Sequence, residues 1–352
     1  MDHEESIDHE HACCSISRGH AIGKAAALFG VSSLLSTLAT DSVEAAEPAD
    51  NAIVVTLLGT GTPSPIPDRY GCSTLVQAAG LNLVFDTGRG APVRLNQIGV
   101  SNGQIDAVFL THFHSDHLNG LPDLWMTGYL PNPFGYRPRA LELWGPKGTV
   151  RIAKAMRATF SDDIRIRIQD QAVPEVATEI FANEYTRDGA IIQRKGVTVT
   201  AFEVNHGPLI KPAYGYRVDY AGRSVVISGD TRLNENVISH GTGADLLIHE
   251  VCAAPQSIVD RAEIKAIMDH HTSPEEAGTV FSRAKPRLAA YTHISQPTIS
   301  GVRPVDIDAI VARTRTNWSG PMIAGTDLLR FVVGSEVTVQ RWDSAKRAYL
   351  AA

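Results

Sequence analysis

The sequence predicts an α/β protein. Strand-like apolar runs alternate with helix-like runs in both halves of the chain, such as Asp106–Leu110 before Leu121–Tyr129 and Asp245–His249 before Pro274–Arg283. Histidine and acidic residues follow the ends of several apolar runs, which is where α/β proteins place their sites. A hydrophobic content of 43% and a charged content of 20% are ordinary for a globular chain.

The expected elements can be given in chain order. Strand-like runs are rich in apolar and β-branched residues. They are Ile53–Gly59, Ser73–Val76, Leu81–Asp86, Asp106–Leu110, Leu141–Trp144, Val197–Val204, Tyr214–Tyr220, Ser224–Ser228, Asp245–His249 and Arg287–Thr292. The helix-like runs are Ala91–Ile98, Leu121–Tyr129, Thr149–Phe160, Pro274–Arg283 and Val305–Thr314. Pro274 suits a first helical turn, and Ser273 before it is the expected N-cap.

The segment from Thr111 to His117 reads Thr-His-Phe-His-Ser-Asp-His and concentrates metal-binding side chains. In an extended segment His112 and His114 point to the same side, so both can hold one ion. Asp116 and His117 come where the chain turns into a helix and can hold a second ion. Imidazole and carboxylate groups suit divalent metals, zinc most often. The sequence therefore predicts a metal site after the strand-like run Asp106–Leu110.

The pattern His-x-His-x-Asp-His resembles the signature of the metallo-β-lactamase superfamily. Further landmarks of that family follow in its order, and they are Val204-Asn205-His206-Gly207, Ser228-Gly229-Asp230-Thr231 and Tyr291-Thr292-His293. The resemblance covers about residues 53 to 341. It implies a four-layer αββα sandwich, in agreement with strands and helices in both halves.

The resemblance also implies a dinuclear zinc site. One ion would be held by His112, His114 and His206, and the other by Asp116, His117 and His293. Asp230 would bridge the ions, whose mutual repulsion requires a shared anionic ligand. Mn²⁺ or Fe²⁺ also suits such ligands at one site. Asp86, in Phe85-Asp86-Thr87-Gly88, matches the family's first motif and would fix a metal-bound histidine from behind.

Two further motifs resemble a narrower branch, that of ribonuclease Z and its arylsulfatase relatives. They are Leu247-Ile248-His249-Glu250 and His271-Thr272-Ser273, with departures at Val251-Cys252 and in the order Thr272-Ser273. The resemblance implies that His271 protonates the leaving oxygen and that Glu250 orients it. General acid help is worth about 10²–10⁴ in rate. We expect Asp116, Glu250 and His271 to form the catalytic group. Histidines that only cap a helix are the structural alternative.

We expect a dinuclear zinc-dependent hydrolase of small sulfate or phosphate esters, arylsulfatase-like, that uses a metal-bound hydroxide and a histidine general acid. Two alternatives remain: a phosphodiesterase of the ribonuclease Z type acting on RNA ends or cyclic nucleotides, and a non-catalytic metal-binding module. Most of the net charge of −6 falls in the first 45 residues. The near-neutral remainder favours a small anionic ester over a nucleic acid as partner. The sequence leaves the oligomeric state open.

The candidates for the wall of an aryl pocket are aromatic residues near the first motif, although most such side chains belong to a core. They are Trp125, Tyr129, Phe134 and Tyr136. Residues 161–196 lack a clear pattern, and we expect an irregular insert that forms a cap or rim over the cleft. Cys72 and Cys252 are too few for a disulfide framework, and the sequence leaves open whether they pair.

Residues 1–50 are expected to be an export leader and linker, and residues 51–352 the catalytic domain. Arg18 and Lys24 flank the start of the apolar run Ala25–Ala39, and Val43-Glu44-Ala45 resembles a cleavage site with small residues. Cleavage would release the mature protein into the periplasm or the medium. A cytosolic tail is the alternative. No segment is long enough to anchor the chain in a membrane.

Overall fold

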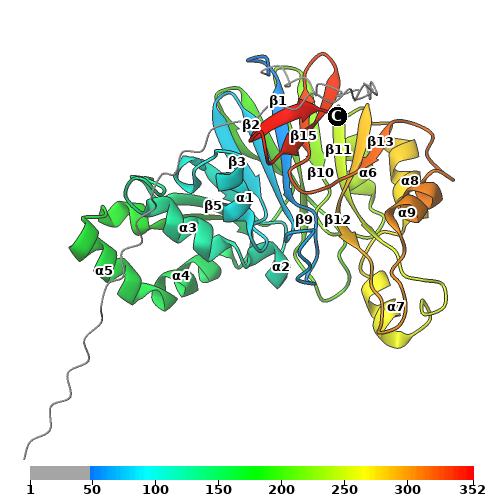
Figure 1. Ribbon diagram of the computed structural model, residues 1–352, viewed down its shortest axis with the longest axis horizontal. Coiled ribbons are helices and arrows are strands. Elements are labelled where there is room, and N and C mark those ends of the chain that lie inside the picture. Colours follow the sequence, from blue (N-terminus) through cyan, green and yellow to red (C-terminus); the bar gives the residue numbers. More distant parts are fainter. Residues whose placement is uncertain (1–47) are drawn as a thin grey trace, which may run out of the picture. The chain divides into compact units, whose positions relative to one another are not determined.

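The structure is a computed structural model that describes residues 48–352. Almost all of the expected leader lies outside the described residues. Two sheets stack face to face, with helices on both outer faces (Figure 1), which confirms the expected αββα sandwich. No helix between residues 48 and 352 is both long and apolar enough to cross a bilayer.

The first sheet has nine strands, in the order β16-β15-β14-β1-β2-β3-β4-β5-β6. In chain order the strands are β1 Ile53–Gly59, β2 Ser73–Ala78, β3 Leu81–Phe85, β4 Ala107–Phe109, β5 Leu141–Pro146, β6 Ile180–Tyr185, β14 Arg330–Val333, β15 Val337–Asp343 and β16 Ala348–Ala351. Its outer helices are α1 Ala91–Gln97, α3 Leu121–Tyr129 and α4 Thr149–Thr159. The helix α5 Ser161–Gln171 follows α4, and the short helix α2 Ser115–Leu118 follows β4.

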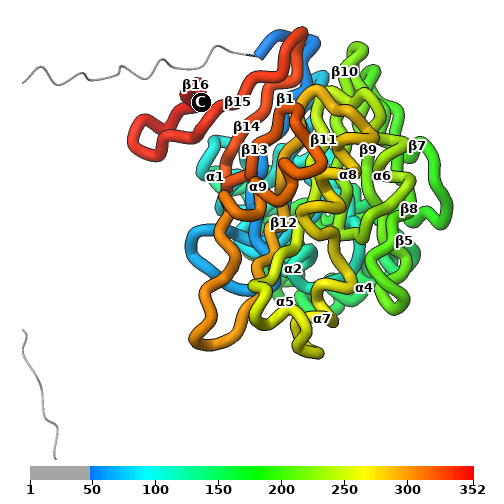
Figure 2. Tube along the Cα trace, turned by 90° about the vertical axis from the view of Figure 1, so that its right-hand side faces the viewer, coloured from blue at the N-terminus to red at the C-terminus, as the bar shows by residue number. Residues whose placement is uncertain are grey.

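The second sheet has seven strands, in the order β13-β12-β11-β10-β9-β8-β7. Its strands are β7 Gly189–Arg194, β8 Val197–Glu203, β9 Tyr214–Tyr220, β10 Arg223–Ile227, β11 Leu246–Cys252, β12 Leu288–Ser295 and β13 Met322–Ala324. Its outer face is covered by α6 Glu235–Gly241, α8 Pro274–Ala284 and α9 Ile307–Thr314. A further helix, α7 Ala262–Met268, lies beside the segment that follows β12, as both Figure 1 and Figure 2 show.

The central strands place alternate side chains on opposite faces of each sheet. These side chains form three hydrophobic cores, one between the sheets and one under the helices on each outer face. In β4, Phe109 faces the core between the sheets, whereas Val108 faces the core under α1, α3 and α4. In β11, Ile248 faces the central core and Leu247 faces α6 and α8. Because both faces of these strands are buried, they are nearly continuous apolar runs in the sequence.

Residues 161–196 are not irregular, and that part of the expectation is corrected. The segment contains α5, a short 3-10 helix and the strands β6 and β7, which form one edge of each sheet. Among the described residues, none from 161–196 lines the cavity at the candidate site. Both strands are only partly buried, so their sequences lack the apolar run on which the other strands were recognised.

Candidate metal centre and active site

The seven predicted ligand residues gather at one edge of the sandwich, just beyond strand ends, in the short helix α2 or near the end of β12. His112 and His114 follow β4, and α2 then brings in Asp116 and His117. The remaining three residues come from the second sheet: His206 after β8, Asp230 after β10 and His293 in β12. The backbone N–H of Tyr214 in β9 donates to the carbonyl of Thr111 at 2.9 Å, which fixes the first motif against the second sheet.

His112, His114, His206 and Asp230 form a first group, in which one ligand atom from each residue lies within 4.8 Å of the others. The Nε2 of His206 is 3.3 Å from the Nδ1 of His114. The Oδ2 of Asp230 is 3.7 Å from Nε2 of His206 and 3.9 Å from Nε2 of His112. Three imidazole nitrogens and one carboxylate oxygen therefore converge on one point.

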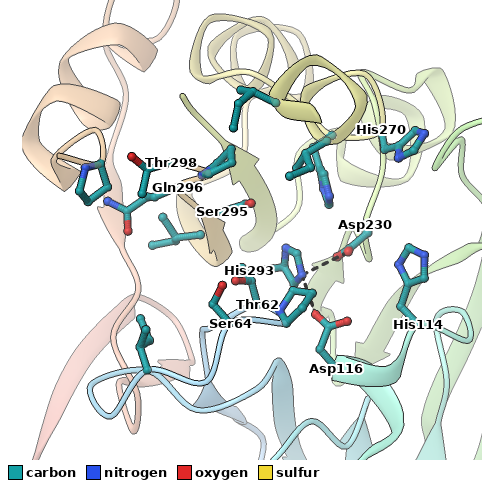
Figure 3. Close-up of a pocket in the computed structure, with 18 residues that line it drawn as sticks. Thr62, Ser64, His114, Asp116, Asp230, His270, His293, Ser295, Gln296 and Thr298 are labelled. Atoms are coloured by element: carbon teal, nitrogen blue, oxygen red, sulfur yellow. Dashed lines mark hydrogen bonds and ion pairs between the residues drawn. The ribbon is translucent and has the colours of Figure 1, made fainter. Parts of the chain in front are cut away.

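Asp116, His117 and His293 form a second group with the same 4.8 Å limit. The Nε2 of His293 lies 3.2 Å from Oδ2 of Asp116. The Oδ2 of Asp230 lies 3.3 Å from Nε2 of His117. It also lies 3.3 Å from Nε2 of His293 (Figure 3). Asp230 is therefore placed between the two groups, as a bridging ligand requires.

The two groups fit divalent cations. The Nε2 atom of His112 is buried and has no hydrogen-bond partner, a costly state for a nitrogen that a cation would satisfy. Burial opposes ionisation of Asp230, but the neighbouring His293 and His117 hold its pKa well below the usual range. Buried imidazole and carboxylate donors of this kind suit zinc, manganese or iron.

In three of these histidines, the ring nitrogen Nδ1, which faces away from the cluster, contacts a neighbouring oxygen atom. The Nδ1 of His117 is 2.7 Å from Oδ2 of Asp86, which also accepts from the Thr111 hydroxyl at 2.8 Å. The Nδ1 of His112 is 2.9 Å from the Thr111 hydroxyl, and the Nδ1 of His206 is 2.9 Å from the His270 carbonyl. Such contacts fix the ring and direct Nε2 to the cluster. The place of Asp86 is the one the sequence predicted.

The backbone around the cluster is strained. Asp86 has a φ of 56° and His293 a φ of 40°, a region that costs residues other than glycine about 1–3 kcal/mol. Only glycine can occupy position 88, because a Cβ there would lie 2.5 Å from the Asp116 carbonyl oxygen and 2.3 Å from the carbonyl carbon of Gly71. The surrounding fold holds these residues where the side-chain cluster needs them.

The partly buried His271 and the fully buried Glu250 form a pair beside the second group. The Oε1 of Glu250 accepts the backbone N–H groups of Thr231 at 3.2 Å and Thr272 at 3.0 Å, and it lies 3.2 Å from Nδ1 of His271. Burial lowers the pKa of His271, but the Glu250 carboxylate outweighs it and raises that pKa to about 9. His271 also offers a nitrogen within 4.8 Å of ligand atoms of Asp230 and His293. The geometry therefore suits a proton donor, and it also leaves a ligand role open.

A cavity of about 560 Å³ adjoins both groups. Sequence reasoning missed two of its walls, namely α7, through Ile264 and Ile267, and the segment from Ser295 to Pro304. The three-residue spacing of Ile264 and Ile267 was the one available signal.

The expected aromatic wall is absent from this cavity. Trp125 and Tyr129 are buried in the core, where Trp125 donates its indole N–H to the Thr178 carbonyl at 3.2 Å. Phe134 and Tyr136 are more than half exposed, and among the described residues neither lines the cavity. Cys72 and Cys252 are free and buried.

The comparisons with known proteins agree with this geometry. A family profile described as the β-lactamase superfamily domain matches residues 82–294. Ribonuclease Z of Mycobacterium marinum is 36% identical over 284 residues, which are 80% of this chain and 99% of that protein. Ribonuclease Z of Mycobacterium tuberculosis H37Rv is 34% identical over 280 residues, which are 79% of this chain and 97% of that protein.

Two solved structures share the fold. The metallo-β-lactamase fold protein YhfI from Bacillus subtilis aligns with a TM-score of 0.61 at 18% identity, over 80% of this chain and 99% of that chain. The short form of human tRNase Z aligns with a TM-score of 0.58 at 22% identity, over 80% of this chain and 99% of that chain. At these identities the likeness concerns the fold alone.

The relatives overturn the expectation about the partner. A small anionic ester was expected, and nucleic acid was argued against, yet the curated relatives at 34–36% identity are named ribonuclease Z. The error lay in the use of net charge. A near-neutral total says nothing about a site whose affinity for phosphate comes from a local cluster of metal-binding groups.

Proposed function

The chain belongs to the metallo-β-lactamase superfamily and is a metal-dependent hydrolase of ester bonds, and on that premise we propose that it is an RNA phosphodiesterase of the ribonuclease Z type. One observation carries the proposal. The pair of His271 and Glu250 lies beside the seven-residue cluster, in a chain that aligns with almost the whole length of a ribonuclease Z. The ribonuclease Z alternative thus replaces the arylsulfatase-like reading.

The proposal assigns one divalent ion to each of the two groups, and zinc is the preferred ion. His112, His114 and His206 would hold one ion, Asp116, His117 and His293 the other, and Asp230 would touch both. Ions at these positions supply Lewis-acid activation of water and of the phosphate. The protein's own contribution is to orient the ligands: Asp86, Thr111 and the His270 carbonyl each hold the far nitrogen of one histidine.

His271 is proposed as the general acid. The Glu250 carboxylate faces its Nδ1 and is itself fixed by two backbone N–H groups, so the ring keeps one orientation. A raised pKa keeps the imidazole protonated at neutral pH. The proton on the other ring nitrogen can then pass to the leaving oxygen, which RNA cleavage needs because an alkoxide leaves poorly. His271 lines the same cavity as Asp116 and Asp230.

The test uses the full chain loaded with zinc and three substrates: a precursor tRNA transcript with a 3′ extension, a diribonucleotide and a nitrophenyl sulfate. We expect cleavage of the RNA substrates, no turnover of the sulfate, and no activity in the matched Asp230→Ala protein. Hydrolysis of the sulfate by a protein that leaves every phosphodiester intact would refute the proposal.

A further inference from the structure

The cavity at the metal centre has two chemically different parts. One part is formed by the ligand residues, including Asp116, Asp230 and His293. The other is formed by α7 and by the segment after β12, where Figure 3 shows Gln296 and Thr298 on the side of His293 away from His114. The ligand residues line only the first part of the cavity. The second part can therefore receive a portion of the substrate that does not contact the metal ligands.

The second part is apolar and carries no charge. Ile264 and Ile267 of α7, Ile66 of the loop after β1, and Pro297 and Pro304 all line it. No lysine or arginine lines the cavity among the described residues, and its only carboxylates are Asp116 and Asp230 of the metal groups. A second phosphate would gain nothing from such a wall, whereas a flat, uncharged group would bury apolar surface on it.

Two of these isoleucines stay exposed although they are large. Ile267 is 39% exposed and Ile66 is 47% exposed. They come from segments some 200 residues apart in the sequence, yet both border the cavity that candidate ligands line. Exposed apolar side chains that gather at a cleft mark a binding surface more often than isolated ones do.

Fixed polar groups border the apolar wall. The Thr298 hydroxyl donates to the Val302 carbonyl at 2.7 Å, and the Gln296 amide nitrogen donates to the Val305 carbonyl, so neither side chain is free to rotate. A nucleobase combines an apolar face with donors and acceptors at its edge, and it is the uncharged part of a nucleotide. The volume of the cavity, about 560 Å³, lies in the range of pockets that hold ligands of this size.

We propose that this apolar part of the cavity binds the base of a nucleotide next to the scissile phosphate, with Ile264 and Ile267 on one of its sides. The inference rests on the proposed function, because the cluster of ligands would hold the phosphate while α7 holds the base. It adds that recognition of RNA at this site includes one base, and that α7 determines how tightly that base is bound.

The experiment compares adenosine 5′-monophosphate with ribose 5-phosphate as ligands of the zinc-loaded full chain, by calorimetry. Both carry the phosphate, and only the first carries a base. We expect the nucleotide to bind about tenfold more tightly, because its base buries apolar surface against Ile264 and Ile267. Equal affinity for the two ligands would overturn the inference.

Variants locate the base. Ile267→Asn places a polar but uncharged group on the apolar wall, and it should reduce the preference for the nucleotide to about one without adding a charge that repels the phosphate of either ligand. Ile66→Asn should act in the same way and serves if the first variant is unstable. The control is Ile166→Asn on α5, since Ile166 is 50% exposed and does not line the cavity. A preference that survives both variants at the cavity would overturn the inference.

The two proposals fail separately. If the chain cleaves no phosphodiester but still prefers the nucleotide in a manner that depends on Ile267, the proposed function is wrong and the base site stands. If RNA is cleaved while the two ligands bind equally, the base site is wrong and the proposed function stands.

Discussion

Replacing His271 by alanine should separate proton donation from metal binding. At pH 7 a histidine with the ordinary pKa of 6.5 is about one quarter protonated, whereas a pKa of about 9 makes His271 almost fully protonated. Removal of His271 should therefore cost the whole rate enhancement of a general acid, about 10²–10⁴, which corresponds to roughly 3–5 kcal/mol in the activation free energy. The loss should appear in kcat for a diribonucleotide, whose leaving group is an alkoxide.

The assay pairs that substrate with a nitrophenyl phosphodiester, whose leaving group needs little protonation and should lose much less. Metal content, measured by elemental analysis, should stay unchanged. His240→Ala is the control, because His240 is a half-buried imidazole that stacks on Phe202 at 4.3 Å outside the cavity. Loss of metal in the His271 variant would indicate that His271 is a metal ligand. Equal losses of turnover on both substrates would exclude His271 as the general acid.

Three further outcomes are expected. Asp230→Ala removes the carboxylate between the two groups, so elemental analysis should find fewer than two ions per chain, and retention of both would contradict the bridge. Phe281→Ala empties a fully buried position under the second sheet and should lower the free energy of unfolding by about 3–5 kcal/mol in denaturant titration, while a change below about 1 kcal/mol would contradict the packing. We also propose export, so N-terminal sequencing of the native protein should start near Ala46, and an intact Met1 would exclude it.

The sequence was most informative where burial on both faces leaves a strong local pattern. The expected bounds of Ile53–Gly59, Tyr214–Tyr220 and Leu121–Tyr129 coincide with β1, β9 and α3. Ser273 also caps α8 as expected, since its hydroxyl accepts from the Glu276 N–H and its own N–H donates to the Glu276 carboxylate. Ligand types placed directly after such strands were likewise predictable, because strand ends gather at one edge of a sheet.

The features that the sequence did not predict depend on contacts between distant segments. In β6, the sequence Ile-Phe-Ala-Asn-Glu-Tyr is half exposed at a sheet edge, and pairing with β5 decides its conformation more than its own composition does. The cavity wall is a similar case, since Ile66 and Ile267 come from distant parts of the sequence and border one cavity only in the folded chain. The role of His270 was missed because it acts through its backbone carbonyl, which no side-chain motif reveals.

The ligands are divided between the two sheets, and this division has a mechanical consequence. His112 and His117 extend from the first sheet, whereas His206 and His293 extend from the second. Ions held between them would act as cross-links that prevent the sheets from sliding or parting at that edge, so part of the metal-binding free energy would count as folding free energy. A substitution among these residues would then loosen the joint between the halves of the molecule as well as its chemistry, and activity alone could not tell the two effects apart.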